Sequence, residues 1–450
     1  MKKLIAMLLA LVMVLGLAAC GGNAAPAETK AAPAETKAPA TEAAADNTAA
    51  EGRVYYLNFK PEADATMQEL AALYTETTGV PVKVVTAASG TYDTTLAAEL
   101  DKSSAPTLFQ CGNQGAINSY GDYCYPLDGT AIMDQMTTDA FNLKGEDGQT
   151  LSIGYCYEAF GIIVNKALLE KAGHSIDEIT DFASLKAVAD DIHARAEELG
   201  FDAFSSAGLD GSSSWRFSGH LANMPLYYEF RDDGVTAQPA TITGAYLENF
   251  KNIWDLYTTD SATTGAALAT ATGDESEAEF GEGKAAFYQN GTWEYSNLTG
   301  TFGMDPADLA MIPIYCGVDG EEKAGLCAGT ENCWAINNES SEEDIQATID
   351  FLVWVVTSDE GTTMLAQEFG PCPFKDAKDP ENVFFQDANK YTAEGNYVVT
   401  WAFNWTPAVD DWRAAVVDAL TQYTAGTGDW SAVETAFVQG WATQYAKENA

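Results

Sequence analysis

The sequence predicts a protein of the α/β class whose folded part has two lobes. Three apolar segments typical of strands, at residues 54–57, 80–87 and 106–111, alternate with two segments of helical periodicity, at residues 65–78 and 92–102. This alternation favours a parallel sheet with right-handed crossovers. About 400 residues follow residue 51, which is more than one hydrophobic core usually serves, so two lobes are expected.

Each of the three predicted strands ends in a polar loop, at residues 58–60, 88–90 and 112–114. In open parallel sheets, ligands bind beyond the carboxyl ends of the strands. These loops are therefore expected to form the mouth of a binding site. The candidate side chains on them are Lys60, Glu62, Asn113 and Gln114.

The first 19 residues have the features of an export signal. Lys2 and Lys3 precede an apolar run at residues 4–17, which has the length of a signal peptide rather than of a spanning helix. Small residues directly before Cys20 resemble a bacterial lipobox, which implies that the chain is cut before Cys20 and that its sulfur is lipidated. The alternative is a general signal peptide in which Cys20 is incidental.

Residues 20–51 are predicted to form a disordered tether. The sequence AAPAETK occurs twice in succession, at residues 24–30 and 31–37, and the segment has no aromatic residue and no apolar side chain larger than Ala. Such a segment buries too little surface to offset its chain entropy. No later apolar run approaches the length of a membrane span, so the only expected membrane attachment is the lipid anchor.

The charge excludes several partners. The formal net charge of −43 argues against nucleic acid, whose phosphates require a basic footprint, and against direct adhesion to anionic lipid. A strongly acidic, self-repelling surface fits an exported protein that stays dispersed as a monomer.

The cysteines do not predict a metal centre. Seven follow Cys20, no C-x-x-C occurs, and the three histidines lie far apart in the chain, so neither a zinc nor an iron–sulfur site is expected. Most of these thiols are expected to be buried. A single bridge, such as one between Cys111 and Cys124, stays open.

The segment GKAAFYQNGTWE, at residues 283–294, predicts a strand over residues 284–289 and a turn at Asn290-Gly291. Trp293 follows that turn and stands beside Glu294. A large aromatic residue on a connection is placed where binding residues concentrate. Trp293 is therefore the first candidate for a ligand platform.

Three further tryptophans are candidates for the same role. Trp215 lies in the polar loop at residues 212–217, and Trp401 and Trp405 flank the sequence AFN. Their alternative role is packing, because two aromatic residues four apart also fit the buried face of a helix.

Four segments in sequence order resemble the extracellular solute-binding proteins of carbohydrate ABC transporters (family 1), the group that includes the maltose-binding protein. The most specific is F-x-x-G-K-A-A followed by a strand and N-G-x-W, at residues 280–293. The others are YEAFGIIVNKALLEKAG, APTLFQCGNQGAINSYGDYCYPLDG and GTENCWAIN. The resemblance runs from about residue 53 to the C-terminus. Many members carry an Asp near Asn113 and this sequence does not, so the sugar is left open.

The resemblance implies a two-lobe fold of the periplasmic-binding-protein type (class II), with hinged lobes around a central ligand cleft. We expect residues 52–156 and 316–358 in the N-terminal lobe and residues 157–315 and 359–450 in the C-terminal lobe. The crossings are expected near residues 155–158, 315–325 and 357–362.

The resemblance also implies roles for individual side chains. Trp293 would lie under a sugar ring, and Glu158 would place its carboxylate in the cleft. The alternative for Glu158 is an ion pair between the lobes. An indole offers a flat apolar face to sugar C–H groups, while carboxylates and amides bind the hydroxyls.

These features predict a non-catalytic receptor, without a cofactor, that delivers an oligosaccharide to a membrane permease from the extracytoplasmic face of a bacterial cell membrane. Two alternatives stay open. One is an exported glycoside hydrolase, whose paired carboxylates the sequence does not mark out. The other is the same fold with a polyamine, an amino acid or an iron chelate as its ligand.

Overall fold

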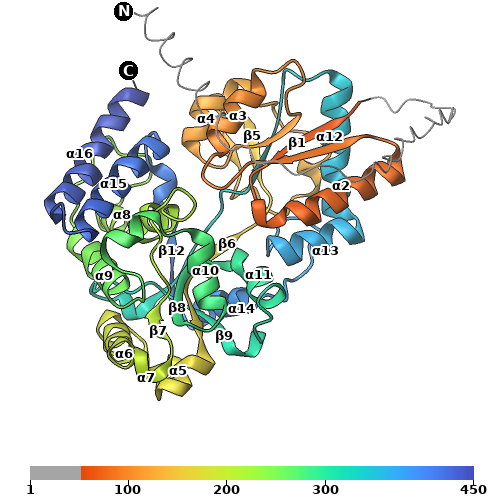
Figure 1. The fold of residues 1–450 in the computed structure, drawn as a ribbon. Coiled ribbons are helices and arrows are strands. Elements are labelled where there is room, and N and C mark those ends of the chain that lie inside the picture. The colour runs from red at the N-terminus through yellow and green to blue at the C-terminus, as the bar shows by residue number, and fades with distance from the viewer. Residues whose placement is uncertain (1–51, 450) are drawn as a thin grey trace, which may run out of the picture. The chain divides into compact units, whose positions relative to one another are not determined.

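The computed structural model describes residues 52–449. The predicted signal peptide, Cys20 and the tether lie outside the described residues. The described part of the chain forms two lobes, each built on a six-stranded sheet with helices around it (Figure 1). This is the predicted α/β architecture.

The first sheet has the strand order β2-β1-β3-β11-β5-β4. Strand β1 (Val54–Asn58) pairs in parallel with β2 (Val82–Thr86) and with β3 (Leu108–Gln110), as the sequence predicts. Strand β11 (Cys333–Ile336) inserts antiparallel between β3 and β5 (Thr150–Gly154). The edge strand is β4 (Leu143–Lys144).

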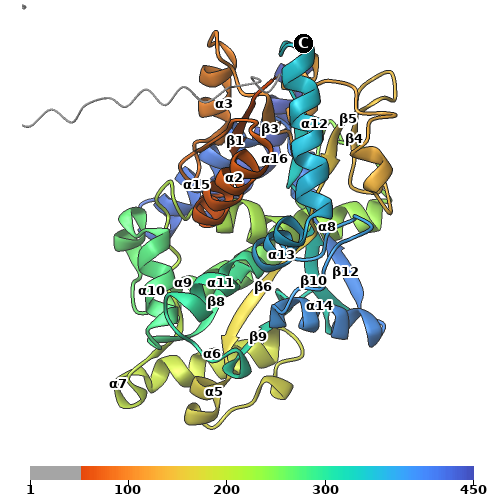
Figure 2. The ribbon, with the colours of Figure 1, turned by 90° about the vertical axis from the view of Figure 1, so that its right-hand side faces the viewer.

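Both faces of the first sheet are buried, because its strands alternate between two hydrophobic clusters. Tyr56 packs with α2 (Asp64–Thr78), α12 (Glu342–Thr357) and α13 (Asp359–Glu368). The next residue, Leu57, packs on the other face with α3 (Tyr92–Leu100) and α4 (Gln114–Tyr120). Figure 2 shows α2 and α12 on the outer face of this lobe.

The second sheet has the order β12-β10-β6-β8-β7. Its central strand, β6 (Glu158–Asn165), is buried along its whole length. The strand pairs with β8 (Ala285–Gly291), with β9 (Leu309–Ile312) and with β10 (Ala324–Gly329). The edge strands are β7 (Asp202–Phe204) and β12 (Tyr397–Thr400).

Helices cover both faces of the second sheet as well. One face packs on a large cluster that contains Trp254, Trp412 and Trp441, and the other face packs on a smaller cluster around Phe384. The helices of this lobe are α5 (Lys166–Ala172), α6 (Phe182–Ala194), α7 (Ala196–Leu199), α8 (Ala222–Asp233), α9 (Leu247–Thr259), α10 (Gly273–Gly281), α11 (Tyr295–Gly300), α14 (Val383–Ala393), α15 (Val409–Thr424) and α16 (Trp430–Glu448).

The sheet pairings correct two of the expected lobe boundaries. Strand β10 was expected in the first lobe, within residues 316–358, but it pairs with β6 in the second sheet. The return crossing therefore lies at residues 330–332, between β10 and β11. Helix α13 was expected in the second lobe, but Met364 and Leu365 pack in the first. The last crossing accordingly follows Phe374, which still belongs to the first cluster.

The expected turn at Asn290-Gly291 is also corrected. These two residues are the last of β8, where Asn290 pairs with Gly161 and Gly291 pairs with Phe160. The chain leaves the strand only at Thr292. Trp293 thus does lie on a connection, a single 3-10 turn (Thr292–Glu294) that leads into α11.

The seven cysteines from Cys111 to Cys372 are free thiols, so the bridge that the sequence left open between Cys111 and Cys124 is not formed. None of the helices over residues 52–449 combines the length and the apolarity needed to cross a membrane.

Candidate ligand-binding site between the lobes

A cavity of about 890 Å³ lies between the two lobes. The first lobe lines it with the loops that follow β1, β2 and β3, as the sequence predicts. The second lobe lines it with the end of β8, the π-helical turn Arg216–Leu221, and the first turns of α10 and α15. The volume falls in the upper part of the range of about 300–1,000 Å³ that is usual for small-molecule sites.

Trp293 forms part of the cavity wall and is only partly buried. Its indole lies flat against the end of β8, because Gly291 has no side chain there. A Cβ on Gly291 would come within 2.2 Å of the ring. Gly291 therefore determines the position of the indole. From the sequence alone, Gly291 was predicted only to be a turn residue.

Trp215 extends the aromatic wall. Its ring centroid lies 6.1 Å from that of Trp293, and its Nε1 donates to the backbone carbonyl of Ser212 at 2.9 Å. His220 lies between them, 5.0 Å from Trp215 and 5.5 Å from Trp293. The structure thus brings two predicted platforms together.

His220 is neutral in this wall. Burial, together with Arg413 and Arg216, lowers its pKa well below the usual value. Because the amide nitrogen of Gln289 donates to Nδ1 of His220 at 2.9 Å, the ring proton sits on Nε2. His220 is thereby a hydrogen-bond donor rather than a charge.

Trp401 closes another part of the cavity. It is 7% exposed and lies 5.4 Å from Phe160 and 5.4 Å from Phe403. Its Nε1 has no hydrogen-bond partner among residues 52–449. Packing and ligand contact were the two predicted roles of Trp401, and the position of its side chain is compatible with both.

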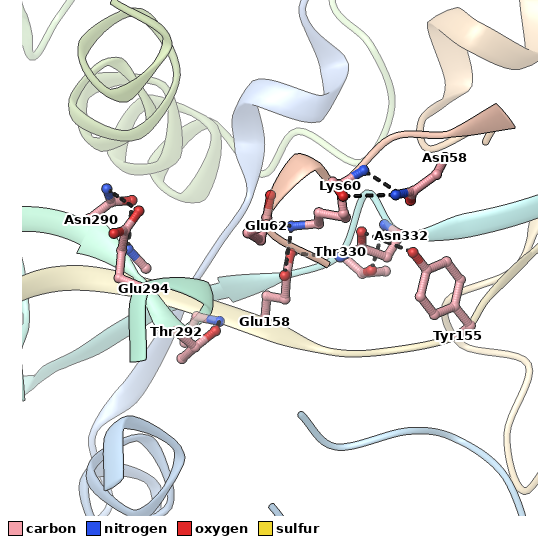
Figure 3. A network of polar contacts seen from close by, with 12 residues as sticks. Asn58, Lys60, Glu62, Tyr155, Glu158, Asn290, Thr292, Glu294, Thr330 and Asn332 are labelled. Carbon is pink, nitrogen blue, oxygen red and sulfur yellow. Dashed lines mark hydrogen bonds and ion pairs between the residues drawn. The ribbon is translucent and has the colours of Figure 1, made fainter. Parts of the chain in front are cut away.

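Lys60 and Glu158 form a buried ion pair across the lobes, with Lys60 Nζ 2.8 Å from Oε1 of Glu158 (Figure 3). Asn332, on the return crossing, donates to the other carboxylate oxygen at 2.6 Å. Burial alone lowers the pKa of Lys60, but the carboxylates of Glu158 and Glu62 outweigh it and raise that pKa overall. Both oxygens of Glu158 are thus engaged, as the ion-pair alternative predicts, although the side chain lines the cavity.

Glu62 and Asn113 also line the cavity. Glu62 lies 3.4 Å from Lys60 Nζ. Asn113 caps α4, since its side-chain oxygen accepts from the backbone N–H of Ala116 at 2.9 Å.

Gln114 and Trp405 are not brought to this cavity. They line an adjoining cavity of about 680 Å³, which shares Gly112, Asn113 and Trp401 with the first. Trp405 stacks on Phe230 at 5.7 Å. Asn113 is the N-cap of α4, and Gln114 is the first residue of that helix. The side chain of Gln114 therefore points away from the first cavity.

Several cavity residues were not predicted from the sequence. Among them are Asp93, Gln110, Glu277, Glu294 and Arg413. Of these residues, only Glu294 could have been predicted from the sequence, because it directly follows Trp293. Arg413 lies on α15, some 120 residues further along the chain, and no motif connects the two.

The described residues contain no group of three or more His, Cys, Asp or Glu side chains that could hold a metal ion. The cavity instead combines aromatic faces with carboxylates, amides and a neutral imidazole. That combination can bind an apolar surface edged with hydrogen-bonding groups.

Comparison with known proteins agrees with this geometry. Residues 69–393 match the family model described as bacterial extracellular solute-binding protein. No curated protein sequence matches. In each of the next three comparisons the alignment covers 88% of this chain. The solute-binding protein RafE in complex with raffinose is similar with a TM-score of 0.68 and 14% identity over 100% of its length.

Two further structures have the same fold. The GacH receptor of Streptomyces glaucescens, solved unliganded and with acarbose, matches with a TM-score of 0.65 and 18% identity over 98% of its length. A chitin oligosaccharide binding protein matches with a TM-score of 0.67 and 13% identity over 99% of its length. These likenesses establish the periplasmic-binding-protein type of fold. The chain belongs to the bacterial extracellular solute-binding proteins, the non-catalytic receptors of ABC transport.

Proposed function

We propose that the protein is an oligosaccharide receptor that delivers its ligand to an ABC importer, held at the extracytoplasmic face of the membrane through a lipid on Cys20. The observation that carries the proposal is that three tryptophans, Trp293, Trp215 and Trp401, line one cavity. Indole faces suit the C–H faces of pyranose rings. The similar structures with raffinose and acarbose support the same ligand class.

Delivery requires that the ligand be held and then released. The lobes are joined at residues 155–158, at residues 330–332 and after Phe374, so a rotation about these short segments opens and closes the cavity. Closure brings the loops after β1, β2 and β3 onto the aromatic wall of the other lobe. A sugar bound there would contact both lobes and stabilise the closed form.

A thermal-shift panel tests the ligand class. The purified protein is heated with raffinose-type, malto-, xylo- and chito-oligosaccharides, and separately with amino acids and polyamines. A ligand that binds only the folded protein raises the midpoint. We expect at least one oligosaccharide to raise it. A rise with an amino acid or polyamine and with no saccharide would contradict the proposal.

The Trp293→Ala variant tests the site. We expect its affinity for the bound saccharide to fall by about tenfold or more, because a stacking contact and its apolar burial are lost together. Trp354→Ala is the matched control, since Trp354 packs on Tyr74 in the first lobe and does not line the cavity. Equal affinities for Trp293→Ala and the unchanged protein would show that the platform lies elsewhere.

A further inference from the structure

The cavity has a marked excess of negative charge. Eleven Asp and Glu side chains line it, against three Lys or Arg side chains. A neutral sugar needs hydrogen-bond acceptors but no net charge. The excess therefore calls for a more specific account of the ligand.

The three cations that line the cavity are Lys60, Arg216 and Arg413. Lys60 is held by Glu158 and Glu62. The buried guanidinium of Arg216 donates to Ser213 Oγ at 2.8 Å and to the carbonyl of Gln289 at 3.0 Å, and it makes no ion pair within residues 52–449. Arg216 and Arg413 make no ion pair in the described part of the chain, and together they offset only part of the excess of carboxylates in the cavity.

Glu277 and Glu294 form such a group beside Trp293. Both are partly buried, and neither makes an ion pair in the described part of the chain. Their partners are amides: Asn290 Nδ2 donates to Oε1 of Glu294 at 2.7 Å, and the side chain of Asn297 donates to Glu277 (the Asn290–Glu294 contact is drawn in Figure 3). Burial, and then the neighbouring Glu277 carboxylate, raise the pKa of Glu294 well above its usual value. Glu294 therefore holds its proton more tightly than a free glutamic acid does.

A further acceptor in the same cavity lacks a donor. Gln110 is 7% exposed, and its Oε1 has no hydrogen-bond partner in the part of the chain that the structure describes. A buried acceptor that stays unpaired costs about 1–3 kcal/mol. The ligand therefore has to bring donors to a wall that offers mainly acceptors.

We infer, on the basis of the proposed function, that the site selects saccharides that carry a protonated amine, and that Glu277 and Glu294 receive this ammonium group next to the indole of Trp293. An ammonium supplies three N–H donors and the missing positive charge. It takes the place of the proton that Glu294 holds. The sugar ring that carries it lies against the aromatic wall.

Matched pairs of ligands test the inference. Glucosamine oligomers and N-acetylglucosamine oligomers of the same length and linkage differ in charge but share their rings. Isothermal titration with the purified protein at low salt should show binding of the amine form at least about tenfold tighter than that of the acetylated form, a gap that narrows as salt is added. Near neutral pH, binding of the amine form should also release protons, which titrations in buffers of different ionisation enthalpy detect.

Two variants locate the ammonium. Glu294→Gln and Glu277→Gln should each remove most of the preference for the amine form, measured as the ratio of the affinities for the amine and the acetylated oligomer. Glu197→Gln is the control, because Glu197 is exposed on α7 and does not line the cavity. Thermal midpoints of all three variants show that they are folded.

The outcomes separate this inference from the proposed function. If acetylated or other neutral oligosaccharides bind as tightly as every amine-bearing partner, the inference is overturned and the proposed function stands. If spermidine binds and neither oligomer does, both are overturned. If the amine form is preferred but Glu294→Gln and Glu277→Gln keep the preference, the assignment of these two carboxylates is wrong.

Discussion

Lys60 of the first lobe lies 2.8 Å from Glu158 at the start of the second, and both side chains are buried. The pair stands where the chain first crosses between the lobes, and Asn332 on the return crossing holds the same carboxylate. One contact thus ties the loop after β1 to two of the crossings. Its effect on stability and on lobe closure can be measured separately.

Removing one partner of this pair should be costly. Lys60→Met leaves the carboxylate of Glu158 buried without its counter-ion, so we expect the free energy of unfolding to fall by about 3–5 kcal/mol. Glu158→Leu should have a similar effect. The double variant should lose less than the sum of the two, because no charge is then left unpaired. Denaturant titration measures all three, and strictly additive losses would contradict the coupling.

The position of the Trp293 indole should depend on Gly291. A methyl group in Gly291→Ala would stand within 2.2 Å of the ring, so the indole has to move and the affinity for the bound saccharide should fall by several fold. Gly211→Ala is the control, because a Cβ there meets no atom within 4 Å. Titration of both variants with one saccharide decides the matter. Unchanged affinity in Gly291→Ala would show that the ring position is unimportant for binding.

Asp93 on α3 and Asp410 on α15 should make the lobe contact sensitive to pH. Burial, then Asp410 and Glu331, raise the pKa of Asp93 to about 7, and Arg413 opposes the shift only in part. Since the folded protein holds this proton more tightly than the unfolded chain, the contribution of Asp93 to stability is most favourable at low pH and is lost as pH rises from about 4 to 7.

The Asp410→Asn variant tests that direction. It removes the side chain that opposes ionisation of Asp93, so at pH 8 its thermal midpoint should exceed that of the unchanged protein. At pH 5 the two midpoints should differ less. Asp93 lies within the cavity between the lobes but remains accessible to solvent there, so added salt should shrink the difference. A larger gain at pH 5 than at pH 8 would reverse the argument.

The cysteine thiols should react slowly while the protein is folded. Six of the seven described thiols are buried, and burial raises the pKa of Cys156 and of Cys316 well above the usual value. Cys372 is less covered, although burial still raises its pKa to about 12. At pH 8 a thiol reagent should label Cys372 first and the others only after unfolding. Cys372→Ser should remove that first phase, and rapid labelling that persists in this variant would contradict the expected burial.

The local pattern predicted the elements better than it predicted their assignment to lobes. The three parallel strands β1, β2 and β3 follow from apolar runs that the sequence displays directly. The assignment of β10 to a lobe does not follow from the sequence, because β10 is a run of small residues that fits either sheet. Helix α13 was assigned to the wrong lobe because the expected crossing was placed before it, whereas its apolar face packs beside α2.

The residues that line the cavity were predicted best where a single residue type has a distinctive place in the chain. Trp293, Trp215 and Trp401 stood out as large aromatic residues on polar connections, and all three line the cavity. Gln110 did not stand out, because it ends a buried strand and reads as part of its pattern. The role of Gly291 depends on the Trp293 indole that lies over it, and this contact cannot be predicted from the local sequence pattern.

The position of β11 has a consequence for the order in which the chain acquires structure during synthesis. This strand joins β3 to β5 in the middle of the first sheet, yet it lies more than 200 residues after β3 in the chain. The sheet therefore stays split into two pieces until most of the polypeptide has left the ribosome. An incomplete sheet leaves open edges, so the first lobe completes its fold only after residues 333–336 have been made.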